Sequence, residues 1–341
     1  MATIKPGTGG ERYVPVEERS GAMSDVYFTR DLSPEGLLRI FDKIAPALKG
    51  KIAVKLHTGE KHGPNIIPRS FVKALIEQKL PDATIIETNT YYAGDRYTTE
   101  KHRETLAVNG WDFCPVDITD EHGTTYLPVQ DGKWFTQMSV GESLPTYDSM
   151  LTLTHFKGHT QGGFGGSNKN IGIGCADGRI GKKMIHTPEG SDNMWGNLQE
   201  ELMERITEST KATIDHFGKQ VVYINVLRNM SVSCDCEGVK AAPVVTPDIG
   251  IVASTDILAV DNASVDLVYA LPEKAGAALR ERIESRHGHR QLSYMKELGM
   301  GNNRYHLLDI DRQDREISLQ EAVAGVKDTW EPDQYQVSKM R

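Results

Sequence analysis

Strand-like and helix-like segments alternate along the first third of the chain, and this alternation limits the possible folds more than any other feature of the sequence. Short runs rich in β-branched and apolar residues occur at 25–29, 51–57, 83–88 and 113–118. Helical patterns lie between them at 33–48, 67–80 and 98–110. Ser33 and Pro34 are a typical helix start, and Asn109 followed by Gly110 is a typical helix end. Strands that alternate with helices of this length are typical of βαβ units, which build a parallel sheet.

The second half of the chain repeats this mixture of elements. Further strands are predicted at 148–156, 220–227, 248–255 and 305–310, and helices at 195–217, 256–271, 274–286 and 290–299. The sequence therefore predicts an α/β fold with a mostly parallel, Rossmann-like sheet built from βαβ units and a second α/β part packed on it. We expect a flexible leader at 1–22, an N-terminal α/β domain at 23–147, a C-terminal α/β domain at 148–310 that carries a glycine-rich loop, and a tail at 311–341.

Composition excludes several classes of partner. Lys and Arg number 39 against 47 Asp and Glu, so the net charge is −8 and no basic stripe for nucleic acid is present. No apolar run reaches the roughly 18–20 residues of a membrane span, and no secretory segment follows the N-terminus. Four scattered cysteines are too few for a disulfide scaffold, which favours the reducing cytoplasm. The partners we expect are a small anionic molecule and either a second copy of the chain or another protein.

Polar loops follow the second and third predicted strands. They read HTGEKHGPN at 57–65 and TNTYYAGDR at 88–96. Because ligands of parallel sheets bind beyond the carboxyl ends of the strands, these loops are candidate site segments. His57, Glu60 and Asn89 are the side chains that we select from them.

A third candidate segment begins HFKGHTQGGFGGSNKNIGIGC at 155–175 and continues to His186. It matches neither the dinucleotide-binding glycine pattern nor the phosphate loop. Its glycines permit a nest of backbone N–H groups, which binds anions, beside Lys157, Lys169, Lys182 and Lys183. A flexible hairpin loop with solvated lysines is the alternative, and the residue types leave both interpretations open.

Histidine and cysteine recur in this segment and in SCDCEG at 233–238. His155 and His159 lie on the same side of an extended chain, and thiolate with imidazole suits zinc or iron. His155, His159, Cys234 and Cys236 are therefore candidate ligands of a divalent metal. The alternatives are histidines that hydrogen-bond in a polar cleft and cysteines that pack as small apolar side chains.

Several segments together resemble one known family. They are VKLHTGE at 54–60, ETNTYYAGDR at 87–96, the stretch 155–186, CDCEG at 234–238 and DIGIVASTDILAVDNASVDLV at 248–268. In this order they resemble the family called domain of unknown function 362, over residues 24–310. The resemblance implies an α/β fold with a cleft, and it implies no reaction. Many members of that family carry a ferredoxin-like insert with iron–sulfur clusters, but residues 187–200 hold no cysteine here, so we expect no cluster of that type. A looser analogy is to the nickel-pincer lactate racemases.

Two functional hypotheses follow. The first is a metal-dependent enzyme that acts on a small anionic substrate in a cleft around residues 155–186. In it, His57, His186 and Lys157 are the candidate catalytic residues. The candidate substrate-binding residues are Glu60, Asn89, Lys169, Asn170 and Lys182. The alternative is a non-catalytic metal-binding or redox accessory protein that works with a partner.

Overall fold

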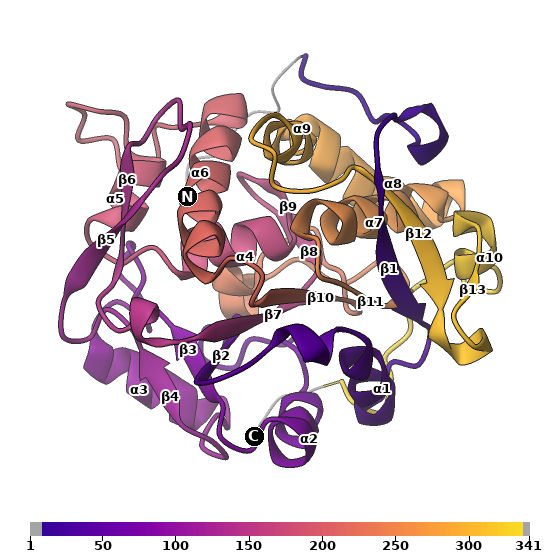
Figure 1. Ribbon diagram of the computed structural model, residues 1–341, viewed down its shortest axis with the longest axis horizontal. Helices are drawn as coiled ribbons and strands as arrows, with labels where there is room; N and C mark the ends of the chain where they lie inside the picture. The colour runs from indigo at the N-terminus through magenta and orange to yellow at the C-terminus, as the bar shows by residue number, and fades with distance from the viewer. Residues whose placement is uncertain (1–8, 337–341) are drawn as a thin grey trace.

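The strands of the protein were located in a computed structural model that describes residues 9–336. They are β1 (Met23–Thr29), β2 (Ile52–Lys55), β3 (Thr84–Glu87), β4 (Val116–Ile118), β5 (Thr124–Pro128), β6 (Gln137–Gly141), β7 (Ser149–His155), β8 (Lys157–His159), β9 (Gly163–Gly165), β10 (Val221–Leu227), β11 (Gly250–Ser254), β12 (Arg304–Asp309) and β13 (Arg315–Glu316). Nine of them form one sheet in the order β13–β12–β1–β11–β10–β7–β2–β3–β4 (Figure 1). The pairs β5–β6 and β8–β9 form two separate hairpins.

The helices lie between these strands. They are α1 (Pro34–Ile44), α2 (Arg69–Lys79), α3 (Thr99–Val108), α4 (Ser167–Gly174), α5 (Gly181–His186), α6 (Gln199–Phe217), α7 (Ile257–Ala270), α8 (Glu273–Ser285), α9 (Arg290–Glu297) and α10 (Leu319–Val323). Short 3₁₀ turns are η1 (Val16–Glu18), η2 (Ala45–Ala47), η3 (Leu144–Thr146), η4 (Asp235–Lys240) and η5 (Ile310–Arg312). None of the helices in residues 9–336 has the length and apolar character needed to cross a membrane.

The sheet is mostly parallel, as the sequence predicts. The run β10–β7–β2–β3–β4 is parallel throughout, and β1 pairs with β12 in parallel. β11 runs antiparallel to both of its neighbours, β10 and β1. Every residue of β7 and β10 is buried, which is typical of strands covered on both faces. Strands from both sides of the expected domain boundary at 147–148 pair in this one sheet.

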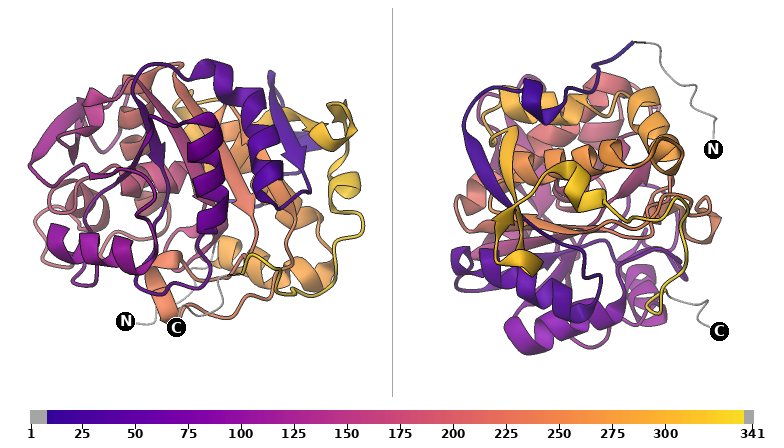
Figure 2. Two further views of the ribbon diagram at one scale, coloured as in Figure 1. Left: turned by 90° about the horizontal axis from the view of Figure 1, so that it is seen from below. Right: turned by 90° about the vertical axis from the view of Figure 1, so that its right-hand side faces the viewer.

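Helices cover both faces of the sheet. α1, α2 and α3 lie on one face, and α4, α6 and α7 lie on the other with α8 and α9 beside them (Figures 1 and 2). Phe41, Phe71 and Leu75 belong to the first core, and Ile206 and Leu258 to the second. The sheet therefore lies between two hydrophobic cores.

The glycine-rich segment is more ordered than the expected loop. It forms the hairpin β8–β9, and α4 and α5 follow. Asp261, in α7, accepts hydrogen bonds from the backbone N–H groups of Ser167 (2.7 Å) and Asn168 (2.9 Å) at the start of α4. A carboxylate at a helix N-terminus satisfies N–H groups that have no partner within the helix. Asp261 thus caps a helix other than its own.

Both ends of the described chain pack on the fold. Arg19, within the expected leader, forms an ion pair with the fully buried Asp266 of α7 at 2.5 Å, and the ring of Tyr13 stacks on Tyr269. Residues 311–336 contain part of η5, β13 and α10. Beyond them, Asp333 accepts hydrogen bonds from Arg228 at 2.5 and 2.7 Å. Residues 1–8 and 337–341 of the expected leader and tail lie outside the described part.

Candidate functional site

Three neighbouring strands bring the candidate residues to one edge of the sheet. β2, β7 and β10 are parallel, so the chain that follows each one leaves at the same end. His57 follows β2, the hairpin β8–β9 follows β7, and the segment 228–249 follows β10. A Cβ at Gly158 would lie 2.6 Å from Val232 backbone atoms, so only glycine lets β8 approach this segment. That approach places His159 beside the Cys-x-Cys sequence.

The sulfur atoms of Cys234 and Cys236 lie close to His159. One ligand atom from each of the three residues falls within 4.8 Å of the others. His159 and Cys234 are buried, and Cys236 is partly exposed. Two sulfurs and an imidazole at this spacing match the donor set of a zinc or iron site. We call these three residues the sulfur cluster.

The hydrogen bonds of His159 define which ring nitrogen carries a proton. Its Nδ1 accepts the backbone N–H groups of Gly162 (2.9 Å) and Gln161 (3.2 Å). Burial and the Lys169 charge lower the pKa of His159, so the ring is neutral. A neutral imidazole whose Nδ1 accepts must carry its proton on Nε2. His57, whose pKa burial also lowers, accepts the N–H of Gly59 through Nδ1 at 2.9 Å in the same way.

Cys234 receives most of the donors in the cluster. Its sulfur accepts the backbone N–H of Cys236 at 3.3 Å. The pKa of the Cys234 thiol lies well below its ordinary value because Cys236 hydrogen-bonds to it, and His159 and His57 act in the same direction. The bond to Cys234 and burial raise the pKa of Cys236. Within the pair, these contacts favour the thiolate at Cys234 and the thiol at Cys236.

The two lysines near the sulfurs differ in their partners. Burial disfavours the Lys157 charge, but Asp235, 3.2 Å away, raises the net pKa of Lys157. Lys169 has no hydrogen-bond or ion-pair partner among residues 9–336, and burial lowers its pKa. Asp235 therefore neutralises Lys157, whereas the cysteine sulfurs are the negative groups that act most on Lys169.

His155, a predicted metal ligand, lies outside the sulfur cluster. Its Nδ1 faces both carboxylate oxygens of Asp235 at 2.9 and 3.0 Å, and its Nε2 is 2.7 Å from the Arg228 carbonyl oxygen. Both ring nitrogens are therefore committed to oxygen atoms. His155 instead fixes Asp235, the residue between the two cysteines, and connects it to Arg228 and hence to Asp333.

Sequence reasoning missed a buried charged group beside the cluster. Arg96 donates to Glu60 at 2.8 and 2.9 Å, and Tyr92 donates to the same carboxylate at 2.5 Å. Glu87, the last residue of β3, pairs with Lys55 at 2.9 Å. Glu60 is thus neutralised by protein groups. Tyr92 and Arg96 stand in the segment 88–96 that was selected for its polarity, which was the available signal.

The remaining candidate residues differ in how fully their polar atoms are hydrogen-bonded. Asn89 binds Thr99 and His102, Asn170 binds Thr154 and two carbonyl groups, and Lys182 binds Thr88 and two carbonyl groups. These three side chains support the local fold. His186 is 6% exposed, and its Nδ1 has no partner among the described residues. Burial, followed by the nearby charge of Lys169, lowers the pKa of His186 to about 3.

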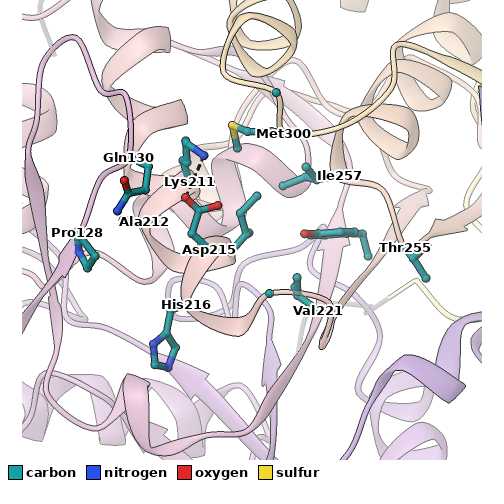
Figure 3. A pocket seen from close by; sticks show the side chains of 14 residues that line it. Pro128, Gln130, Lys211, Ala212, Asp215, His216, Val221, Thr255, Ile257 and Met300 are labelled. Carbon is teal, nitrogen blue, oxygen red and sulfur yellow. Dashed lines mark ion pairs between the residues drawn. The ribbon is translucent and has the colours of Figure 1, made fainter. Parts of the chain in front are cut away.

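A separate pocket of about 530 Å³ opens at the other end of β10 (Figure 3). Val221, at the start of β10, lines it together with Tyr223 and Met300. Lys211 and Asp215 lie at this pocket and pair with each other at 2.9 Å. None of the residues selected from the sequence lines it. The sulfur cluster is therefore the better candidate site.

The comparison with protein families agrees with the sequence resemblance. The family described as domain of unknown function (DUF362) matches residues 52–266, and no curated protein matches the chain. The lactate racemase apoprotein from Thermoanaerobacterium thermosaccharolyticum is similar at 11% identity and a TM-score of 0.43, over 72% of this chain and 57% of that one. A protein from Thermotoga maritima is similar at 11% identity and a TM-score of 0.37, over 57% of this chain and 49% of that one. The chain thus spans about half the length of each.

Proposed function

The chain belongs to the DUF362 family, and we propose that it is an enzyme that binds a small anionic substrate and reacts with it through the Cys234 sulfur. The observation that carries this proposal is the set of donors that converge on Cys234. The backbone N–H and thiol of Cys236, with His159 and His57, all favour its thiolate. A thiolate is the reactive form of cysteine, and neighbouring positive charge and N–H donors are what stabilise it.

The anionic substrate follows from the charges around the sulfur. Lys157 is paired with Asp235 and Glu60 with Arg96, so these groups neutralise one another. Lys169 has no such partner in the described chain, and its charge lowers the pKa of His186 after burial does. A carboxylate on the substrate would supply the missing partner of Lys169. Because Lys169 lies within electrostatic reach of the Cys234 sulfur, that carboxylate would hold the reacting carbon near Cys234.

Alkylation with a charged and a neutral reagent tests both parts of the proposal. With iodoacetate or iodoacetamide, the sulfur forms a bond to the CH₂ carbon, and iodide leaves with its electron pair. We expect Cys234 to react below the ordinary thiol pKa of about 8.5, and faster with iodoacetate because Lys169 attracts its carboxylate. Mass spectrometry of tryptic peptides measures both rates at Cys234.

Two variants sharpen this experiment. Lys169→Gln should remove the preference for iodoacetate, whereas Lys183→Gln, a matched change in α5, should keep it. Cys234→Ser should abolish the fast reaction. A Cys234 that reacts equally with both reagents, with the pH dependence of a free thiol, would contradict the proposal.

The metal-dependent enzyme expected from the sequence is the second candidate. It is favoured by the three ligand atoms of His159, Cys234 and Cys236 that lie within 4.8 Å of one another. Two thiolates and an imidazole would suit zinc or iron. Binding through Nε2 of His159 would require that atom to lose its proton, and therefore the ring to release the N–H groups of Gln161 and Gly162.

Elemental analysis of the purified chain separates the two candidates. Stoichiometric zinc or iron that is lost in His159→Ala and kept in His155→Ala would favour the metal enzyme. A metal-free chain with a reactive Cys234 would favour the thiolate enzyme. A metal-loaded chain that turns over no small acid and copurifies with a protein would instead fit the accessory role. Either thiol chemistry needs a reducing compartment, so we place the protein in the cytoplasm.

A further inference from the structure

Aromatic rings from two segments of the chain gather around Trp195. Trp195 lies in the connection between α5 and α6, with its ring centroid 4.8 Å from that of His186 and 5.8 Å from that of Tyr91. Tyr92 lies 6.3 Å from the same indole ring. We call these four residues the aromatic cluster. They come from the chain after β3 and from the chain around the end of α5.

The aromatic cluster is held in place by polar bonds at its edges. The hydroxyl of Tyr91 lies 3.0 Å from the Thr187 hydroxyl, and that of Tyr92 donates to Glu60 at 2.5 Å. Trp195 nevertheless exposes 36% of its surface. A large ring that packs against fixed neighbouring rings and is open to solvent presents a flat apolar surface.

Two polar groups without partners adjoin these rings. His186 is more than nine-tenths buried, and its Nδ1 has no partner within residues 9–336. Lys169 is partly exposed and has no hydrogen-bond or ion-pair partner among these residues, and its charge acts on His186. Buried polar groups are normally hydrogen-bonded, so the unsatisfied Nδ1 of His186, near an unpaired ammonium, indicates a ligand. A carboxylate accepts from both a neutral imidazole N–H and an ammonium.

We propose that the substrate of this site is a small aromatic or heteroaromatic acid. Its carboxylate pairs with Lys169 and His186, and its ring packs against Trp195 and Tyr92. This inference rests on the proposed function, because it names the class of the anion on which Cys234 acts. Trp195 is then the residue that determines specificity for a flat ring over an aliphatic group.

Two acids of equal charge and similar size test the inference on the full-length chain. Benzoate has an aromatic face, and cyclohexanecarboxylate has none. We expect titration calorimetry to give a Kd for benzoate about three- to tenfold lower, the range that aromatic pairing adds beyond buried area. Trp195→Leu should bring this ratio close to one, and Trp195→Phe should keep most of it. Trp134→Phe, a change beside α6 away from the aromatic cluster, should leave the ratio intact.

Equal affinities for the two acids in the unaltered chain would overturn the inference, as would a ratio that survives in Trp195→Leu. Lys169→Gln should weaken both acids by the same factor, and unchanged affinities would contradict the placement of the carboxylate. Alkylation of Cys234, measured in parallel, keeps the two proposals apart. Selective benzoate binding with an ordinary Cys234 supports the ligand class and contradicts the proposed function, whereas a reactive Cys234 without selectivity contradicts the ligand class alone.

Discussion

Replacement of Arg19 by Met should destabilise the protein strongly, although Arg19 lies in a segment that the sequence suggests is a flexible leader. The guanidinium donates to both carboxylate oxygens of Asp266 at 2.5 and 2.8 Å. The side chains of Arg19 and Asp266 are 6% and 0% exposed. Removal of one partner leaves a buried charge that retains its bond from Tyr305. Loss of a buried partner of this kind costs about 3–5 kcal/mol.

Urea unfolding followed by circular dichroism measures this loss. Arg39→Met is the matched control, because Arg39 pairs with Asp31 and Asp311 at 48% exposure and such surface pairs contribute about 0–1 kcal/mol. Arg19→Met combined with Asp266→Asn should recover part of the stability, since no buried charge then remains. A loss below about 1 kcal/mol in Arg19→Met would refute the reasoning.

The same variant has a defined pH dependence. Burial raises the pKa of Asp266 above its ordinary value even beside Arg19. Without Arg19 the folded-state pKa rises further, so the folded chain binds a proton that the unfolded chain releases. The deficit of Arg19→Met should therefore be largest above that raised pKa and shrink as the pH falls towards the unfolded value of about 3.9. A deficit that stays constant between pH 8 and pH 5 would contradict the buried-charge explanation.

Three further predictions concern the surroundings of the site. Gly158→Ala should lower the free energy of unfolding by about 1–3 kcal/mol and slow alkylation of Cys234, because its Cβ would meet the Val232 backbone. Urea unfolding and alkylation measure the two effects. Gly165→Ala is the control and should show neither, because its Cβ would only touch the Lys157 side chain at 3.4 Å. In the native chain at pH 8, Cys114 and Cys175 should stay unmodified by iodoacetamide, because burial raises their pKa values to about 11 and about 12; a labelled Cys175 in the mass spectrum would argue against this. Glu87→Gln should cost about 3 kcal/mol by isolating Lys55. Burial disfavours the Glu87 charge, but Lys55 and Arg96 leave the pKa of Glu87 well below the ordinary value. The contribution of Glu87 to the free energy of unfolding is therefore present above about pH 4.3 and is lost as the pH falls. The free energy of unfolding should accordingly fall less steeply with acid in the variant.

Local patterns were sufficient for much of the sheet and its helices. Ser33 was expected to start a helix, and its hydroxyl accepts the Gly36 N–H at the start of α1. Runs of buried apolar residues identified β7 and β10, which pair side by side. These features depend on neighbours within a few positions, which the sequence displays directly. The helix α4 depends on a distant residue instead, because the carboxylate that caps it belongs to Asp261, 94 positions away.

The candidate site also has residues that the sequence identifies and residues whose positions depend on distant contacts. The Cys-x-Cys sequence and His159 were found from their types, and the fold brings them within 4.8 Å. The sequence around His155 favours a metal ligand as much as the sequence around His159 does. The His155 ring is held away from the sulfurs by its contacts to Asp235 and to the Arg228 carbonyl, which lie 80 and 73 positions away. Spacing along a strand could not separate a histidine that faces the sulfurs from one that anchors the residue between them.

The connection from Asp333 through Arg228 and His155 to Asp235 has a practical consequence for anyone who handles the protein. A fusion partner or affinity tag at the C-terminus would pull on a segment two side chains removed from the loop that holds both sulfurs. The N-terminal segment is anchored instead on α7 and on Asn303. Purification handles therefore belong at the start of the chain.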